Sequence, residues 1–168
     1  MNINLQKIHV NATEAFPNSK FPVLHYKGIL EVPGLFPAKY VSDLFERNNW
    51  SNSWDAGIFD CHHYHSNVHE ALGVYGGETT VILGGEGGIE VRLEKGDVLI
   101  IPAGVAHKNA GAEHDIKCVG AYPLGQDYDM MYGKPGEREQ AAQNLIRTPI
   151  PDTDPVRGKD GLPKIWED

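Results

Sequence analysis

The chain has 168 residues, of which 40% are hydrophobic and 23% charged, the composition of an ordinary globular protein. Fifteen Lys and Arg residues against 23 Asp and Glu residues give a formal net charge of −8, which makes nucleic acid and anionic membranes poor partners. Two cysteines are too few for a disulfide framework or a cysteine-based zinc motif.

The first part of the chain, residues 1–55, begins with strand-like segments at 3–10 and 23–30. A helix is predicted over residues 37–48, because Pro37 suits the first helical position. The apolar residues of this helix form one stripe: Tyr40, Val41, Leu44 and Phe45.

Residues 56–125 have the pattern of a β-sandwich or barrel, because short segments rich in Val, Ile and Tyr are separated by glycines. Residues 89–93 alternate apolar and charged side chains, as a strand with one wet face does. Further strands are predicted at 98–101 and 116–122. The glycine-rich stretch 84–88 lacks the Gly-Lys-Ser/Thr ending of a phosphate-binding loop, and we interpret it as a hairpin.

The last part, residues 126–168, changes character again. A helix is predicted over residues 135–147, and the prolines that follow should exclude regular structure, so that an extended tail lies across the barrel. We therefore expect one domain over 1–168, all-β with a few peripheral helices and a barrel core at 56–125. The sequence shows no signal peptide and no apolar run long enough to span a bilayer, so a cytoplasmic location is expected.

A short segment with several histidines carries the chemical signal. On a strand, His63 and His65 project to the same side, so their imidazoles can converge on one ion. The turn formers at 66–67 allow the chain to reverse and to bring Glu70 beside them. His107 follows a tight turn after a buried strand and is the expected third imidazole.

Three imidazoles and one carboxylate suit a divalent transition metal, namely Fe, Mn, Ni, Zn or Cu, and leave one or two positions for water or substrate. His69 is an alternative to Glu70, because a bulge between Ser66 and His69 would exchange the two faces of the strand. Without that bulge, His69 should lie at the surface or in an interface. The alternation also predicts that Phe59 and Cys61 pack inside the barrel.

The spacing of these residues resembles the two motifs of the cupin superfamily. The first motif is matched by Gly57, His63, His65, Glu70 and Gly77. The second motif is matched by Gly96, Pro102, Gly104 and His107. One departure is Gly111, where the family usually has an Asn that is not a ligand.

The segments 62–66, 72–75 and 154–166 further resemble one bacterial subfamily, the YjlB-like cupins. The resemblance implies a double-stranded β-helix, that is, a jelly-roll barrel. It also implies a homodimer, since open barrels protect their edges by exchanging strands. The metal ligands implied by the resemblance are His63, His65, Glu70 and His107.

Two classes of function remain open. The first is an enzyme in which the metal acts as a Lewis acid on a small organic molecule. The resemblance to metal-bearing small cupins favours a dioxygenase over an isomerase or lyase. In an isomerase or lyase, Glu70 or a metal-bound hydroxide would be the catalytic base. The second is a sensory or binding cupin that holds a metal or a small molecule without turnover. The fold does not name the substrate.

Overall fold

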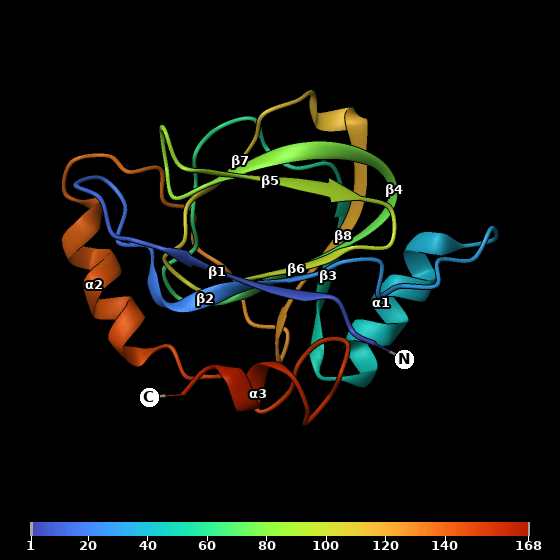
Figure 1. The fold of residues 1–168 in the computed structure, drawn as a ribbon. Coiled ribbons are helices and arrows are strands. Elements are labelled where there is room, and N and C mark those ends of the chain that lie inside the picture. Colours follow the sequence, from blue (N-terminus) through green and yellow to red (C-terminus); the bar gives the residue numbers. More distant parts are fainter. Residues whose placement is uncertain (1, 168) are drawn as a thin grey trace.

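The computed structural model describes residues 2–167 and shows antiparallel strands in two facing layers, with helices outside them (Figure 1). The strands are β1 (Leu5–Val10), β2 (Ser19–Tyr26), β3 (Trp50–Ala56), β4 (Glu70–Leu83), β5 (Ile89–Glu94), β6 (Val98–Ile101), β7 (His107–Asn109) and β8 (Ile116–Pro123). The helices are α1 (Pro37–Arg47), α2 (Glu137–Arg147) and α3 (Leu162–Ile165), with a 3-10 turn at Glu113–Asp115. Within residues 2–167, every helix is too short or too polar to cross a membrane. The predicted all-β class is confirmed.

The long strand β4 belongs to both layers. Its first half pairs with β6 and β8 in a sheet of order β1-β2-β6-β4-β8-β3, and its second half pairs with β5 and β7. Between the halves, the register with β8 shifts between Val74 and Gly76. Gly77 follows with a φ of +71°, a conformation that a residue with a Cβ adopts only with strain. These two features bend β4 from one layer into the other.

Side-chain alternation along β4 separates two hydrophobic cores. Leu72 and Val74 point into the space between the layers, whereas Ala71 points to the outer side of the sheet. The outer side is covered by α1 and by the C-terminal tail with Trp166. Glu70 is in phase with Leu72 and Val74, so the same alternation directs its carboxylate into the barrel.

A buried carboxylate holds the tail against the sheet. Asp154 accepts a hydrogen bond from the Tyr26 hydroxyl at 2.7 Å and from the backbone N–H groups of Val156, Arg157 and Leu162 at 2.8 to 3.0 Å. Burial and the Asp154 charge raise the pKa of Tyr26 above its ordinary value, so the hydroxyl stays a donor. The tail is therefore a fixed part of the molecule.

Several elements differ from the sequence-based expectation. Strand β2 covers 19–26 and not 23–30, and β7 was not predicted. The tail is not wholly extended, because residues 162–165 form α3 with Pro163 in its first turn, where a missing N–H breaks no helical hydrogen bond. Strand β3 was not predicted, because its sequence WSNSWDA lacks an apolar alternation. The hairpin expected at 84–88 does join β4 to β5.

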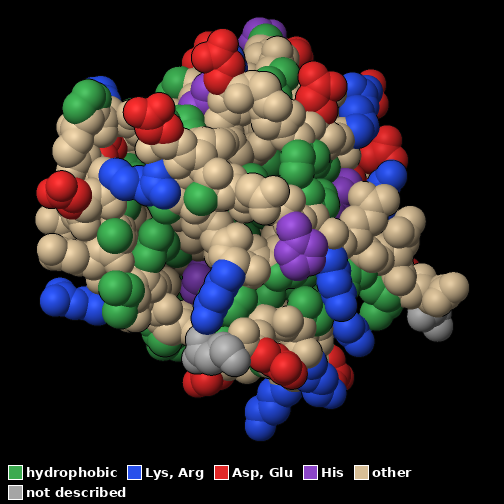
Figure 2. All heavy atoms as spheres, turned by 60° about the vertical axis from the view of Figure 1, so that its left-hand side comes forward, with side chains coloured by type: hydrophobic (Ala, Val, Ile, Leu, Met, Phe, Trp, Pro, Cys, Tyr) green, Lys and Arg blue, Asp and Glu red, His purple; other side chains and the backbone are tan. Residues whose placement is uncertain are grey.

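On the face toward which α2 lies, charged side chains of both signs are interspersed (Figure 2). Arg138 of α2 donates hydrogen bonds to the carbonyl oxygens of Thr13 and Glu14, which ties α2 to the segment between β1 and β2.

Candidate metal centre

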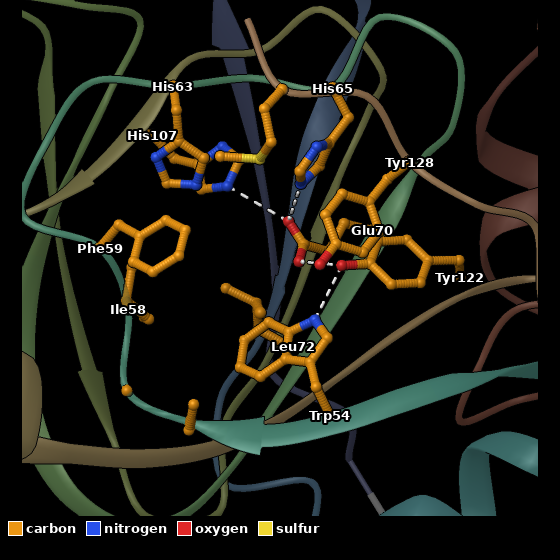
Figure 3. Close-up of a pocket in the computed structure, with 13 residues that line it drawn as sticks. Trp54, Ile58, Phe59, His63, His65, Glu70, Leu72, His107, Tyr122 and Tyr128 are labelled. Carbon is orange, nitrogen blue, oxygen red and sulfur yellow. Dashed lines mark hydrogen bonds and ion pairs between the residues drawn. The ribbon is translucent and has the colours of Figure 1, made fainter. Parts of the chain in front are cut away.

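The four side chains expected to form a site lie together inside the barrel (Figure 3). Glu70 is the first residue of β4 and His107 is the first residue of β7. His63 and His65 come from the segment between β3 and β4. Each of the four residues is 5% exposed or less. The structure thus brings all four together, away from bulk water.

The segment that carries His63 and His65 is not the regular strand that was expected. Only His63 and Tyr64 pair there, in isolated bridges to His107 and Met131. Alternation persists locally, since the ring of Tyr64 packs in a separate cluster with Met131. The two imidazoles converge because of these few bridges and not because of a continuous ladder.

Backbone carbonyl groups set the orientation of all three imidazoles. Their Nδ1 atoms lie at hydrogen-bond distance from carbonyl oxygens, in the pairs His63–Cys61 (2.9 Å), His65–Asp129 (2.6 Å) and His107–Val105 (3.0 Å). A carbonyl oxygen only accepts, so each Nδ1 carries a proton. Each Nε2 is therefore left for another partner, as in histidines that bind metals.

The free nitrogens converge with the Glu70 carboxylate. One ring nitrogen from each of His63, His65 and His107 lies within 4.8 Å of the others. Glu70 Oε2 lies 3.1 Å from His65 Nε2 and 3.2 Å from His107 Nε2. Unprotonated Nε2 atoms and a carboxylate oxygen are all acceptors, so this arrangement requires positive charge between them. The donor set fits a divalent transition metal.

The pKa values of the cluster reflect the same crowding. Burial and the neighbouring His107 lower the pKa of His63 to about 3. Burial alone would lower the pKa of His65, but the Glu70 carboxylate raises it above its ordinary value. Burial alone would raise the pKa of Glu70, but His65 and His107 hold it below its ordinary value. In the absence of a metal, a proton on His65 supplies the positive charge, and a divalent cation would displace that proton.

His69 lies outside this cluster although it is adjacent to Glu70. Its Nε2 donates to the carbonyl oxygen of Pro149 at 3.0 Å, and its Nδ1 accepts from the N–H of Ala103 at 2.9 Å. Its ring centroid is 5.0 Å from that of Trp166, and burial lowers its pKa to about 4. Both nitrogens are thus already used. His69 was expected at the surface or in an interface. It is not at the surface, because the C-terminal tail with Trp166 covers it within this chain.

A cavity of about 230 Å³ adjoins the cluster. Figure 3 shows the imidazoles and the carboxylate on one side of this space and apolar side chains around the rest. The apolar part of the wall is formed by Trp54, Ile58, Phe59, Leu72 and Met130. A small molecule in this space would contact the cluster on one edge and carbon on the others.

Phe59 and Cys61 were expected to pack inside the barrel, and only Phe59 does so in part. Phe59 lines the cavity, but half of this residue is exposed at the cavity mouth. Cys61 is exposed and does not line the cavity. The expectation failed because the chain before His63 is irregular, so strict alternation does not extend to these positions.

A hydrogen-bonded pair, Trp54 and Tyr122, lies beside Glu70 and was not predicted from the sequence. Trp54 Nε1 donates to the Tyr122 hydroxyl at 2.7 Å, and that hydroxyl donates to Glu70 Oε1 at 3.2 Å. Burial and the Glu70 charge raise the pKa of Tyr122, which keeps the phenol protonated. Tyr122 is in phase with the inward-facing Ile116 and Cys118 of β8, so alternation along 116–122 could have identified it.

The loop after β8 completes one side of the site. Asp129 provides the carbonyl oxygen that orients His65, and its carboxylate accepts hydrogen bonds from the N–H and the hydroxyl of Ser66. The neighbouring Tyr128 stacks on Tyr122, with ring centroids 4.8 Å apart. This short loop segment therefore both covers the cavity and orients one imidazole.

Comparison with known proteins identifies the family. Residues 56–121 match the family model of the cupin domain. The protein named uncharacterized protein YjlB, from Bacillus subtilis (strain 168), is 41% identical over 147 residues, which cover 87% of this chain and 86% of that protein. The chain belongs to the cupin family. Within it, this cupin is YjlB-like, and its barrel is the cupin jelly roll.

Solved structures are similar to this cupin at low identity. Acireductone dioxygenase from Bacillus anthracis, with a cadmium ion in its active center, has a TM-score of 0.41 at 16% identity over 56% of this chain and 63% of its own. The dTDP-6-deoxy-D-glucose-3,5-epimerase RmlC from Legionella pneumophila Philadelphia 1 has a TM-score of 0.37 at 14% identity over 71% of each chain. Likeness at this level says nothing of the activity of this cupin.

Proposed function

We propose that this cupin is a metal-dependent enzyme that acts on a small organic molecule. One divalent transition metal (Fe, Mn, Ni, Zn or Cu) would be held by His63, His65, Glu70 and His107. The supporting observation is that all three Nδ1 atoms are engaged by backbone carbonyls. This leaves the Nε2 atoms of His65 and His107 beside the Glu70 carboxylate, with the third imidazole, His63, in the same cluster. By contrast, the neighbouring His69 uses both of its ring nitrogens on protein partners.

When bound, such an ion would supply Lewis-acid activation of a substrate oxygen and, if redox-active, a site for O₂. The apolar wall would orient the substrate and exclude water from the reacting edge. Glu70 is proposed mainly as a ligand. Its Oε1, which Tyr122 contacts, is the oxygen through which Glu70 would act as an acid–base group. Because the pKa of Glu70 is lowered, this carboxylate would be a weak base.

We favour a dioxygenase over an isomerase or lyase. Four protein ligands leave two positions of an octahedron, enough for one substrate oxygen and O₂. The adjoining wall consists mainly of apolar side chains. A polyhydroxylated substrate would lose its hydrogen bonds to water there without gaining replacements, which is unfavourable. O₂ and a small apolar molecule suffer no such loss.

The first test is metal content. The metal content per chain is measured by elemental mass spectrometry. Two kinds of sample are compared: protein purified without chelator, and apoprotein reconstituted with each of the five metals. We expect about one ion per chain, because the four ligands form one site. A value near zero after every reconstitution would contradict the proposal.

The second test is turnover. The Fe(II) form is given diketones, thiols and catechols while O₂ consumption is recorded, with His107→Ala as the control. Substrate-dependent O₂ uptake by the wild-type protein, without uptake by His107→Ala, would support a dioxygenase. Metal retention without turnover of any compound would favour a sensory or binding cupin. Light scattering on the same sample tests the homodimer, which stays a prediction.

A further inference from the structure

We propose that the substrate has an apolar or aromatic body, one oxygen-bearing edge that reaches the four-residue cluster, and no further ionic group. This inference rests on the proposed function and adds the substrate class to it. Three properties of the cavity carry it: its size, the chemistry of its wall and the net charge of the cluster.

The size of the cavity limits the substrate to a small molecule. Its volume is about 230 Å³. Pockets for drug-sized ligands span about 300–1,000 Å³, and one water molecule occupies about 30 Å³ of liquid. The space therefore suits a single ring with a short substituent, and it is too small for a nucleotide or an oligosaccharide.

The wall away from the cluster is closely packed carbon. Ile58 and Phe59 lie on one side of the space and the Trp54 ring on another (Figure 3), and Leu72 also lines it. Trp54 takes this place because Gly120 has no side chain. A Cβ at Gly120 would lie 2.1 Å from Trp54 Cε2. An apolar substrate body fills such a space favourably.

Apart from the Tyr128 hydroxyl, the polar groups of the wall already form hydrogen bonds with one another or with Glu70. Trp54 Nε1 donates to Tyr122, and Tyr122 donates to Glu70. No Lys or Arg of residues 2–167 lines the cavity. The Tyr128 hydroxyl, without a hydrogen-bond partner in that same range, offers one neutral contact. A carboxylate, sulfate or phosphate placed against this wall would be buried without a counter-charge, which is strongly unfavourable.

The net charge of the metal-filled cluster favours a substrate with one negatively charged group. A carboxylate that binds a metal is deprotonated and metal-binding imidazoles are neutral, so the cluster filled with a divalent ion has one net positive charge. One phenolate, enolate or carboxylate oxygen at the substrate edge would neutralise it. A second anionic group would leave an unpaired negative charge inside the barrel.

The test compares two ligands that have the same catechol edge. Co(II)-loaded protein is titrated with 4-methylcatechol and with 3,4-dihydroxybenzoate, which differ only in a methyl group against a carboxylate. The visible Co(II) absorption reports binding, and gel filtration checks that the metal stays on the protein. We expect 4-methylcatechol to bind at least about tenfold more tightly, because the carboxylate would meet the apolar wall.

A gain-of-function variant sharpens the comparison. Phe59→Lys places an ammonium group at the half-exposed mouth of the cavity. It should strengthen binding of 3,4-dihydroxybenzoate by about tenfold, because the ammonium pairs with the carboxylate, and it should weaken binding of 4-methylcatechol, because the Phe59 ring no longer contacts the apolar body. The matched control Ile146→Lys makes the same kind of exchange at an exposed site on α2 and should change neither affinity.

The outcomes separate the two proposals. If wild-type protein retains Co(II) but binds 3,4-dihydroxybenzoate equally or more tightly, or binds neither compound, the inference on substrate class is overturned and the metal site stands. If the protein retains neither Co(II) nor any of the five metals of the first test, the proposed function is overturned, and the inference with it.

Discussion

His63 and His107 exchange both of their backbone hydrogen bonds, at 3.2 and 2.9 Å, and their ring centroids lie 4.2 Å apart. The main chain thereby joins the segment before β4 to the start of β7. Two of the proposed ligands are held in place by this bridge whether or not an ion is bound. Such preorganisation lowers the conformational cost of binding a ligand.

Removal of one imidazole should abolish metal retention. His65→Ala and His107→Ala are each expected to lower the metal content after gel filtration from about one ion per chain to near zero. Each change removes a direct ligand, and loss of a mere supporting contact to a ligand already costs about 10- to 100-fold in metal affinity. Circular dichroism checks that the barrel persists.

The matched control is His69→Ala, which should keep its metal. It should lower the free energy of unfolding by about 1–3 kcal/mol, because Ala103 N–H and the Pro149 carbonyl lose their partner. Metal loss in His69→Ala together with metal retention in His65→Ala would refute the assignment.

Asp129 is expected to position His65. In Asp129→Ala, the backbone carbonyl remains but the contacts with Ser66 that hold it in place are lost. Loss of such a supporting contact costs about 10- to 100-fold in metal affinity. Competition with a chelator measures this value. Asp127→Ala in the same loop should stay within about twofold of wild type, and equal losses in the two variants would contradict a positioning role.

The Tyr122 hydroxyl should stabilise the fold around Glu70. Tyr122→Phe leaves Trp54 Nε1 and Glu70 Oε1 without their shared partner. We expect the free energy of unfolding in urea to fall by about 1–3 kcal/mol. Tyr75→Phe, which removes an exposed hydrogen bond to Asp55, should cost less than about 0.5 kcal/mol. A loss of the same size in both variants would count against the buried network.

The buried carboxylate of Asp97 should make the stability of the fold depend on pH in acid. Asp97 accepts hydrogen bonds from His25 at 2.9 Å and from the Gly28 N–H at 2.8 Å. Burial alone would raise the pKa of Asp97, but these bonds hold it below its ordinary value. The stability that Asp97 contributes is therefore present above the unfolded-state pKa of about 3.9 and is lost as the pH falls through the lower folded-state pKa.

Comparison of apoprotein with Asp97→Asn measures this contribution. In urea denaturation, the stability difference between the two proteins should be constant near neutral pH and should shrink below about pH 4. A difference that stays constant into strong acid would show that the Asp97 charge does not matter.

Elements with a local signal could be predicted from the sequence. The helix over 37–48 and the strand at 98–101 have caps, stripes or apolar runs of their own, and both are present within a residue of the expected ends. Strand β3 has no such signal. It is a strand because it pairs with β8, from Trp50 opposite Pro123 to Ala56 opposite Cys118, and such long-range pairing leaves little trace in the local sequence.

The same distinction holds for the site. Alternation correctly places Glu70 on the face of Leu72, and it would have found Tyr122. Tyr128 and Asp129 could not be predicted, because their loop is placed by bonds to Ser66, which is distant in the sequence.

Anomalous diffraction from a crystal of metal-reconstituted protein, recorded at the absorption edge of that metal, tests the central claim most directly. We predict one peak inside the barrel, about 2.0–2.2 Å from Nε2 of His63, His65 and His107 and from a carboxylate oxygen of Glu70. No peak there, or a peak only at surface residues, would contradict the assignment of these four residues as a metal centre.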